Sequence, residues 1–233
     1  TVTVTQAGNP NVAYTTIPEL FAAATSTEKE VHVTFDSWVV SGISTNGKNV
    51  FVTDGTNGFV IYDSAGGLGE TYTVGDILSE EDVTCNLVLY NGFAEIKDLD
   101  ADDLTITSGG TVTPANITLA DLSGVNTGAL VSYEGLTCTV SGSKYYLSDG
   151  TTTLQVYNPL YAFGALEDGK KYNITGVYQQ YNNTKEILPR SAEDIVLLTE
   201  SVTVSDKGFA TYCSENALDF SETDIKAYVG TLT

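Results

Sequence analysis

The chain has 233 residues, of which 42% are hydrophobic, so it is long enough to bury the core of one or two domains. Its 30 acidic residues against 10 Lys and Arg give a net charge of -20, which disfavours nucleic acid and anionic membranes because both bind through cations. No apolar run predicts a transmembrane helix, and three widely spaced cysteines, Cys85, Cys138 and Cys213, predict small buried side chains rather than a disulfide framework or zinc site.

The first half of the chain alternates strand signals with turn signals. A short helix is predicted over 16–24, where Thr16 and Glu19 have the form of a capping box. Asn91-Gly92 predicts a tight hairpin leading into 93–96, because both residues tolerate positive φ. β-branched and aromatic residues predict the other strands, at 31–40, 49–55, 59–63 and 83–90.

The second half repeats this order. Asp54-Gly55 recurs as Asp149-Gly150, and Glu95-Ile96 recurs as Glu186-Ile187, at offsets of 95 and 91 residues. We attribute the smaller offset to a loop insertion at 79–82 in the first copy. A repeat of about 90 residues with five strands predicts a small closed barrel, since closure removes exposed strand edges. The elements of the second copy are a helix at 118–124, strands at 129–140, 144–150, 154–158, 172–181 and 184–188, and an acidic turn with a last strand at 191–198, which matches 100–106.

Both copies resemble OB-fold domains that are common in extracellular and surface proteins of gut bacteria. The resemblance rests on residues 51–54 (FVTD), Tyr62, 72–76 (YTVGD) and 83–96, together with their counterparts in the second copy. It departs at Cys85, where the second copy has Gly176, a change that we expect to need little room. The resemblance implies a mainly β chain with two tandem five-stranded OB-fold barrels, short helices and a partial C-terminal β segment.

The expected domains are the end strand of a preceding β module (1–14), OB-fold domain 1 (15–110), OB-fold domain 2 (111–199) and an incomplete C-terminal β segment (200–233). Residues 1–8 resemble the last strand of a BACON-type β-sandwich module, and 201–233 resemble the start of a surface-protein β-module. Because neither end can form a core alone, we expect the ends to pair or to dock on a barrel, with Phe209, Tyr212 and Phe220 partly buried. The expected location is extracellular, or the outer surface of a bacterial cell, with any signal sequence outside this chain.

The residues that catalysis needs are scarce. His32 is the only histidine, and strand periodicity points it outward beside Thr34 without an evident partner. The stretch 42–49 approaches a P-loop, but Asn49 replaces Ser or Thr and a strand follows instead of a helix. Glu95 and Glu186 could suggest a glycosidase pair, but their equivalent positions in two repeats explain them better. We expect no enzyme, no cofactor and no metal site.

Two weaker signals remain open. The acidic stretch 97–103 is either a solvated turn or a calcium site, although it lacks EF-hand spacing. Ser64, in the sequence Asp63-Ser64-Ala65, resembles an O-glycosylation acceptor of secreted proteins in gut bacteria.

OB-folds bind ligands across strands 2 and 3 and the adjoining loops. Period two directs Val52, Phe59 and Ile61, with Leu147, Leu154 and Val156 in the second copy, toward the barrel cores. The tyrosines of the opposite face could stack on sugar rings or peptide, or could instead cover an interface between modules. The candidate ligand-binding residues are Phe51, Thr53, Val60, Tyr62, Tyr90 and Asn91 in the first copy, and Tyr146, Ser148, Gln155, Tyr157, Tyr181 and Asn182 in the second.

The sequence leaves three functions to compare. The favoured one is a non-catalytic, monomeric secreted or cell-surface multi-module protein whose barrels bind glycan or protein or act as spacers, with nucleic acid not expected as a partner. The alternative is an accessory nucleic-acid-binding part of an extracellular nuclease. An enzyme in its own right fits the residue inventory least.

Overall fold

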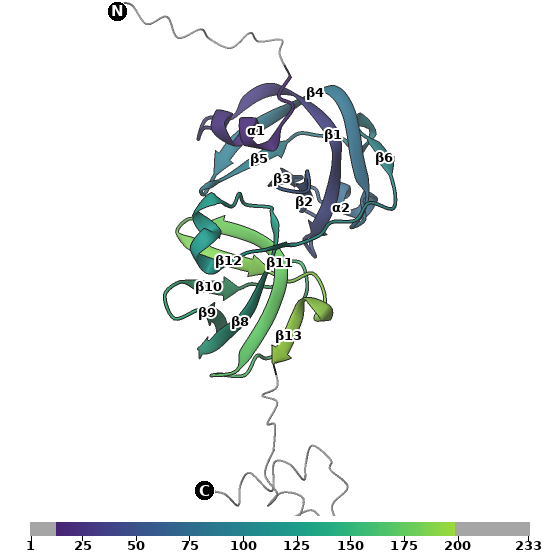
Figure 1. The fold of residues 1–233 in the computed structure, drawn as a ribbon. Coiled ribbons are helices and arrows are strands. Elements are labelled where there is room, and N and C mark those ends of the chain that lie inside the picture. Colours follow the sequence, from purple (N-terminus) through teal and green to yellow (C-terminus); the bar gives the residue numbers. More distant parts are fainter. Residues whose placement is uncertain (1–12, 199–233) are drawn as a thin grey trace, which may run out of the picture. The chain divides into compact units, whose positions relative to one another are not determined.

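The computed structural model describes residues 13–198, which form two closed five-stranded β-barrels, one in each half of the chain (Figure 1). The predicted fold class, mainly β with tandem OB-fold barrels, is confirmed. The expectations for residues 1–12, for the C-terminal segment and for Cys213 lie outside the described residues. Within 13–198, no helix is long and apolar enough to cross a membrane.

In the first barrel the strands follow the order β1-β2-β3-β5-β4, and pairing of β1 with β4 closes the sheet. The pairing of β3 with β5 is parallel and the others are antiparallel. The strands are β1 (Lys29–Ile43), β2 (Asn49–Thr53), β3 (Gly58–Tyr62), β4 (Ile77–Tyr90) and β5 (Phe93–Lys97), with β6 (Thr105–Thr107) added at the edge of β4.

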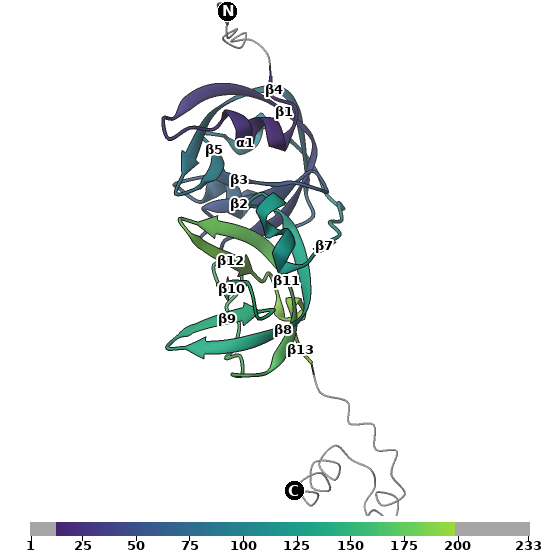
Figure 2. The same ribbon diagram turned by 60° about the vertical axis from the view of Figure 1, so that its left-hand side comes forward.

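The second barrel repeats this topology, with β11 pairing β8 to close the sheet and β10 running parallel to β12. Figure 2 shows the same barrel from a second direction. Its strands are β8 (Leu130–Ser141), β9 (Lys144–Ser148), β10 (Thr153–Val156), β11 (Lys171–Tyr181) and β12 (Thr184–Leu188), extended by β7 (Ala115–Asn116) and β13 (Ile195–Leu198).

The helices are short. The expected N-terminal helix is α1 (Ile17–Ala23), and Thr16 with Glu19 forms the predicted capping box. Its counterpart is a 3₁₀ helix, η2 (Leu119–Gly124), capped by Thr118 and Asp121. The acidic turns become the 3₁₀ helices η1 (Ala101–Asp103) and η3 (Ala192–Asp194). The sequence patterns missed α2 (Gly67–Thr71), which lies between β3 and β4.

Each barrel has its own apolar core. In the first core Val52, Phe59 and Ile61 are fully buried as predicted. In the second core Leu147, Leu154 and Val156 take the corresponding positions. Cys85 and Cys138 are buried free thiols within these cores. Period-two alternation therefore identified the inner faces of β2, β3, β9 and β10 correctly.

One expectation was wrong. Residues 79–82 are not a loop insertion, because they lie inside the continuous strand β4. There the pairing with β1 is irregular and Asp82 has φ 58°, so the extra length is absorbed as a strand irregularity. Cys85 is accommodated in the first core, as expected, whereas the equivalent Gly176 leaves no room for a side chain, because a Cβ there would lie 2.6 Å from the carbonyl oxygen of Leu188.

Candidate functional site

The outer faces of the two barrels meet. Phe51 of β2, Val60 of β3 and Phe93 of β5 form one buried apolar cluster with residues of the second barrel. Those partners are Leu130, Leu160, Val177 and Leu188. The sheet face that sequence patterning assigned to a ligand is therefore partly covered by the neighbouring barrel.

Backbone contacts pin the barrels together at three places. The Thr45 amide donates to the carbonyl of Pro159 at 2.7 Å, and the Asn182 amide donates to the carbonyl of Asn91 at 2.7 Å. At the third place, a Cβ added to Gly58 would lie 1.8 Å from the backbone of residues 128–129. Only glycine permits so close an approach of two backbones.

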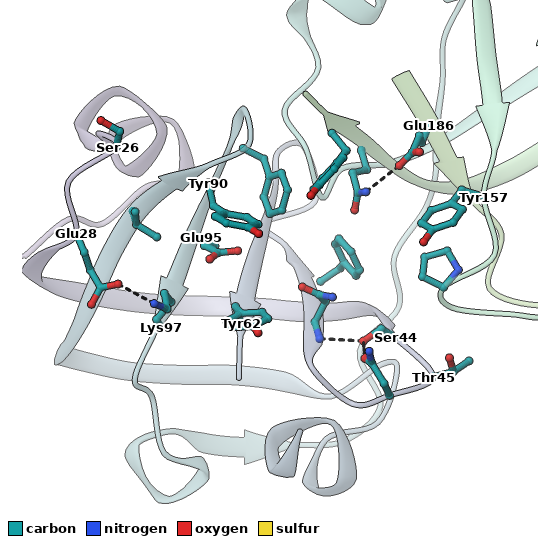
Figure 3. A pocket seen from close by; sticks show the side chains of 18 residues that line it. Ser26, Glu28, Ser44, Thr45, Tyr62, Tyr90, Glu95, Lys97, Tyr157 and Glu186 are labelled. Atoms are coloured by element: carbon teal, nitrogen blue, oxygen red, sulfur yellow. Dashed lines mark hydrogen bonds and ion pairs between the residues drawn. The ribbon is translucent and has the colours of Figure 1, made fainter. Parts of the chain in front are cut away.

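Beside this contact the barrels enclose a groove of about 840 Å³. Figure 3 shows Tyr62, Tyr90, Glu95 and Lys97 of the first barrel on one side, and Tyr157 and Glu186 of the second on the other. The groove has carboxylates, amides and aromatic rings but few cations. Its other lining residues are Ser26, Glu28, Ser44, Thr45, Asn46, Asn49, Phe51, Val88, Phe93, Pro159, Gln179 and Tyr181.

The strand register sets the first wall of the groove. Phe93, Glu95 and Lys97 alternate along β5, so they share its outer face. Tyr90 of β4 lies opposite Phe93, and Tyr62 of β3 lies opposite Lys97. Glu95 therefore occupies the middle of an aromatic face, and the Nζ atom of Lys97 bonds Glu28 Oε2 at 2.7 Å.

Glu95 and Glu186 hold the same position in the two barrels but have different neighbours. Glu186 lies opposite Gln155 and Gln179, whose amides donate to its two carboxylate oxygens at 3.4 and 2.9 Å. Glu95 lies opposite Val60 and Val88, whose side chains have no hydrogen-bond donor.

Burial raises the pKa of both carboxyls. Glu95 is only 4% exposed, and its desolvation raises its pKa from 4.5 to about 7, against an opposing effect of Lys97. Desolvation also raises the pKa of Glu186, while the Gln179 hydrogen bond lowers it. Burial at the shared fold position thus raises the pKa at both sites, and only Glu186 has a neighbouring amide that opposes this effect.

Three tyrosines present exposed ring surface at the groove. Tyr90, Tyr157 and Tyr181 are 51%, 42% and 39% exposed, which is high for large side chains. Phe93 connects two of them, with its ring centroid 6.1 Å from that of Tyr90 and 6.4 Å from that of Tyr181. Asn91 Nδ2 donates to the Tyr181 hydroxyl at 2.8 Å, which holds that ring in place across the interface. The rings offer stacking surface on both walls of the groove.

The structure brings five of the twelve candidate ligand residues to the groove, namely Phe51, Tyr62, Tyr90, Tyr157 and Tyr181. Val60 is fully buried between the barrels. Thr53 and Ser148 donate from their hydroxyls to turn carbonyls. The remaining candidates do not line it: Asn91 and Asn182 lie in the two hairpin turns at the interface, Gln155 binds Glu186, and Tyr146 is half-buried in β9.

The residues that sequence reasoning missed include Glu28, Lys97, Phe93 and Gln179. Glu95 was noticed but explained by repeat equivalence alone. The sequence could have placed Glu95 with Phe93 and Lys97 on the outer face of β5, because the three residues alternate along one strand.

The structure also gives the surroundings of His32, of the acidic stretch 97–103 and of Ser64. His32 is not without a partner, since its Nδ1 lies 2.9 Å from Asp82 Oδ1. In the acidic stretch, Asp98 accepts from Asn86, and Asp103 accepts from the Asp100 amide. Ser64 is exposed in a turn whose Asp63 carboxylate accepts from the Ala65 amide. Its modification stays a prediction.

No family model and no curated protein matches this sequence. Among solved structures, the chain is similar to the p204 HINb domain, with 15% identity, a TM-score of 0.31 and coverage of 72% of this chain and 98% of that one. It is also similar to the Ifi202 HINa domain in complex with a 20-base-pair double-stranded DNA (11%, 0.28, 74% and 95%). A third is a murine DNA-binding protein bound to double-stranded DNA (11%, 0.28, 74% and 97%). We take no residue correspondence from such distant likenesses.

The two DNA complexes among these neighbours contradict two expectations from the sequence. One is that the barrels bind glycan or protein or act as spacers, and the other is that nucleic acid is not a partner. Both rested on the net charge of the whole chain and on the resemblance to surface proteins. The net charge of the whole chain does not describe the charge of any one surface, so it could not decide between these ligands.

Proposed function

We propose that residues 13–198 form a non-catalytic module that binds single-stranded nucleic acid in the groove between the barrels, as the accessory part of an extracellular nuclease. The observation that carries the proposal is the set of exposed rings of Tyr90, Tyr157 and Tyr181, contributed by both barrels to one groove. Aromatic side chains of OB-folds are stacking platforms for bases, and each stacked base contributes ~1–3 kcal/mol.

Charge sets the mode of binding. Lys97, a cation of the groove, is already paired with Glu28, so few positive charges face a phosphate backbone there. The bases rather than the phosphates then supply most of the affinity. We therefore expect a shallow dependence on salt, because few counterions are released on binding. A duplex hides its base faces and should bind more weakly than a single strand.

Fluorescence anisotropy with a labelled oligonucleotide of mixed sequence tests the proposal. We expect a Kd tighter than ~100 μM at ~150 mM salt, and a loss of roughly 5- to 100-fold for Tyr90→Ala. Tyr146→Ala is the matched control, because Tyr146 belongs to the second barrel but does not line the groove. Absence of binding, or equal losses for both variants, would contradict the proposal.

We also propose an extracellular or outer-surface location. The support is the acidic composition and the resemblance of both copies to gut-bacterial OB-folds. Membership of that family, the BACON-like first strand and the absence of catalysis remain parts of this proposal. Fractionation of cells that express the whole protein, with detection in the medium or the outer membrane, tests the location.

A further inference from the structure

Glu95 has a buried carboxyl group with no hydrogen-bond donor among residues 13–198. It is 4% exposed, it lines the groove, and no described side chain or backbone amide donates a hydrogen bond to its carboxylate. The strands on either side contribute Val60 and Val88 at the opposing positions. The carboxylate reaches the groove, where water is its donor, so a ligand that donates N–H groups can take the place of that water.

The second barrel shows what satisfies the same position. Glu186 has two glutamine donors, Gln155 and Gln179, where Glu95 has two valines. The Glu95 carboxylate therefore remains able to accept hydrogen bonds from a ligand, whereas the Glu186 carboxylate already accepts them from two glutamine side chains. A ligand in the groove would take the place of those two amides.

The surroundings of Glu95 restrict the shape of this ligand. Tyr90 and Phe93 contact each other edge to face with centroids 6.1 Å apart, and Tyr62 borders the other side of the same sheet face. Flat rings around a carboxylate favour a planar ligand that stacks and that directs N–H groups from one edge.

We infer that Glu95 recognises a base in the groove by accepting hydrogen bonds from adjacent N–H donors, and that this selects guanine. The inference rests on the proposed function. Guanine has two neighbouring donors on its Watson–Crick edge, N1–H and the N2 amino group, which match the two oxygens of a carboxylate. Cytosine and adenine offer one amino group each, and the thymine imino group lies between two carbonyls that a carboxylate repels.

The test is run at pH 8, above the Glu95 pKa of about 7, and compares oligothymidylates of one length that carry three spaced guanines, hypoxanthines, cytosines or adenines. Spacing the guanines prevents quadruplexes. We expect guanine to bind roughly 5- to 100-fold more tightly than thymine alone, as for a good bidentate base contact. Hypoxanthine lacks only the N2 amino group and should lose most of that gain.

Two variants assign the preference to Glu95. Glu95→Gln should lose the guanine preference while it still binds the thymine oligonucleotide. Val88→Gln should lose it with Glu95 intact, because the new amide stands where Gln179 serves Glu186. Glu70→Gln removes one charge from an exposed position outside the groove and should keep the preference. Circular dichroism confirms that each variant is folded.

The possible outcomes distinguish failure of this inference from failure of the proposed function. Equal affinity for all oligonucleotides would overturn the inference and leave the proposed function standing. Absence of all binding would overturn both. A guanine preference that survives in both groove variants would also overturn the inference. If there is no preference but arginine amide displaces the oligonucleotide through Glu95, the carboxylate recognises a guanidinium and the inference falls.

Discussion

At the scale of single residues, the protein uses one fold position in two ways. Glu95 and Glu186 have the same place in the register, yet only Glu186 is hydrogen-bonded by neighbouring amides. Ionisation therefore costs more free energy at Glu95, because a buried charge is unfavourable where no protein group donates a hydrogen bond to it. Repeat equivalence predicted the shared position from sequence. It could not predict the difference, which depends on the residues that lie opposite across two other strands.

The raised pKa of Glu95 predicts a pH-dependent stability. The folded chain keeps this proton up to pH about 7, whereas an ordinary glutamate releases it near 4.5. The folded state therefore binds more protons between these values, and the free energy of unfolding falls as pH rises through this window. Lys97 and Glu28 are the charges that act on Glu95, in opposite senses. Above pH 7 the cost corresponds to at most ~3 kcal/mol.

Glu95→Gln should remove this cost. We expect the variant to be more stable than the wild type at pH 8, by up to ~3 kcal/mol, and the difference to shrink toward pH 5. Urea denaturation at both pH values measures it. Glu70→Gln, at an exposed position, should show the same small effect at both. If Glu95→Gln lost the same stability at pH 5 and pH 8, ionisation of Glu95 would not destabilise the folded state.

At the scale of elements, the hairpins follow from local chemistry. Asn91 and Gly92 have φ angles of 48° and 98° and join β4 to β5, as the Asn-Gly pair predicted. The strands, their inner faces and the cap of α1 were equally predictable, because each depends on neighbours close in sequence. Strand alternation distinguishes two faces but does not say what covers the outer one, so the burial of Val60 could not be foreseen.

Gly92→Ala tests the hairpin turn. Its φ of 98° is one that residues with a Cβ rarely adopt, so we expect a destabilisation of about 1–2 kcal/mol. Gly164→Ala is the matched control, because Gly164 has no positive φ and a Cβ there would meet nothing within 4 Å. Urea denaturation of both variants measures the difference. Equal stabilities would mean that the turn tolerates the side chain by rearranging.

At the scale of the whole described chain, the contact between the barrels creates the groove. Each barrel has its own core, and a third apolar cluster joins them. That cluster was the part of the site least accessible from sequence. It needs residues about 100 positions apart, such as Phe51 and Leu160, to be brought together by packing alone.

Gly58→Val tests whether this contact couples the barrels. The added side chain would collide with the backbone at Gly128 and Ala129, while neither barrel core contains Gly58. We expect the barrels to separate, so that calorimetry shows two unfolding transitions in place of one and oligonucleotide affinity falls. Gly164→Val should leave a single transition. One transition at an unchanged temperature in Gly58→Val would mean that the barrels do not depend on this approach.

The most direct test of the account is to map the bound oligonucleotide on the protein by NMR. A single-stranded oligonucleotide is titrated into the ¹⁵N-labelled chain, and amide shifts are followed residue by residue. We predict that the largest changes fall at Tyr90, Glu95 and Lys97 and, on the other wall, at Tyr157 and Tyr181, which line the groove. Changes confined to other surfaces, or none at millimolar oligonucleotide, would contradict the assignment of this groove as a nucleic-acid site.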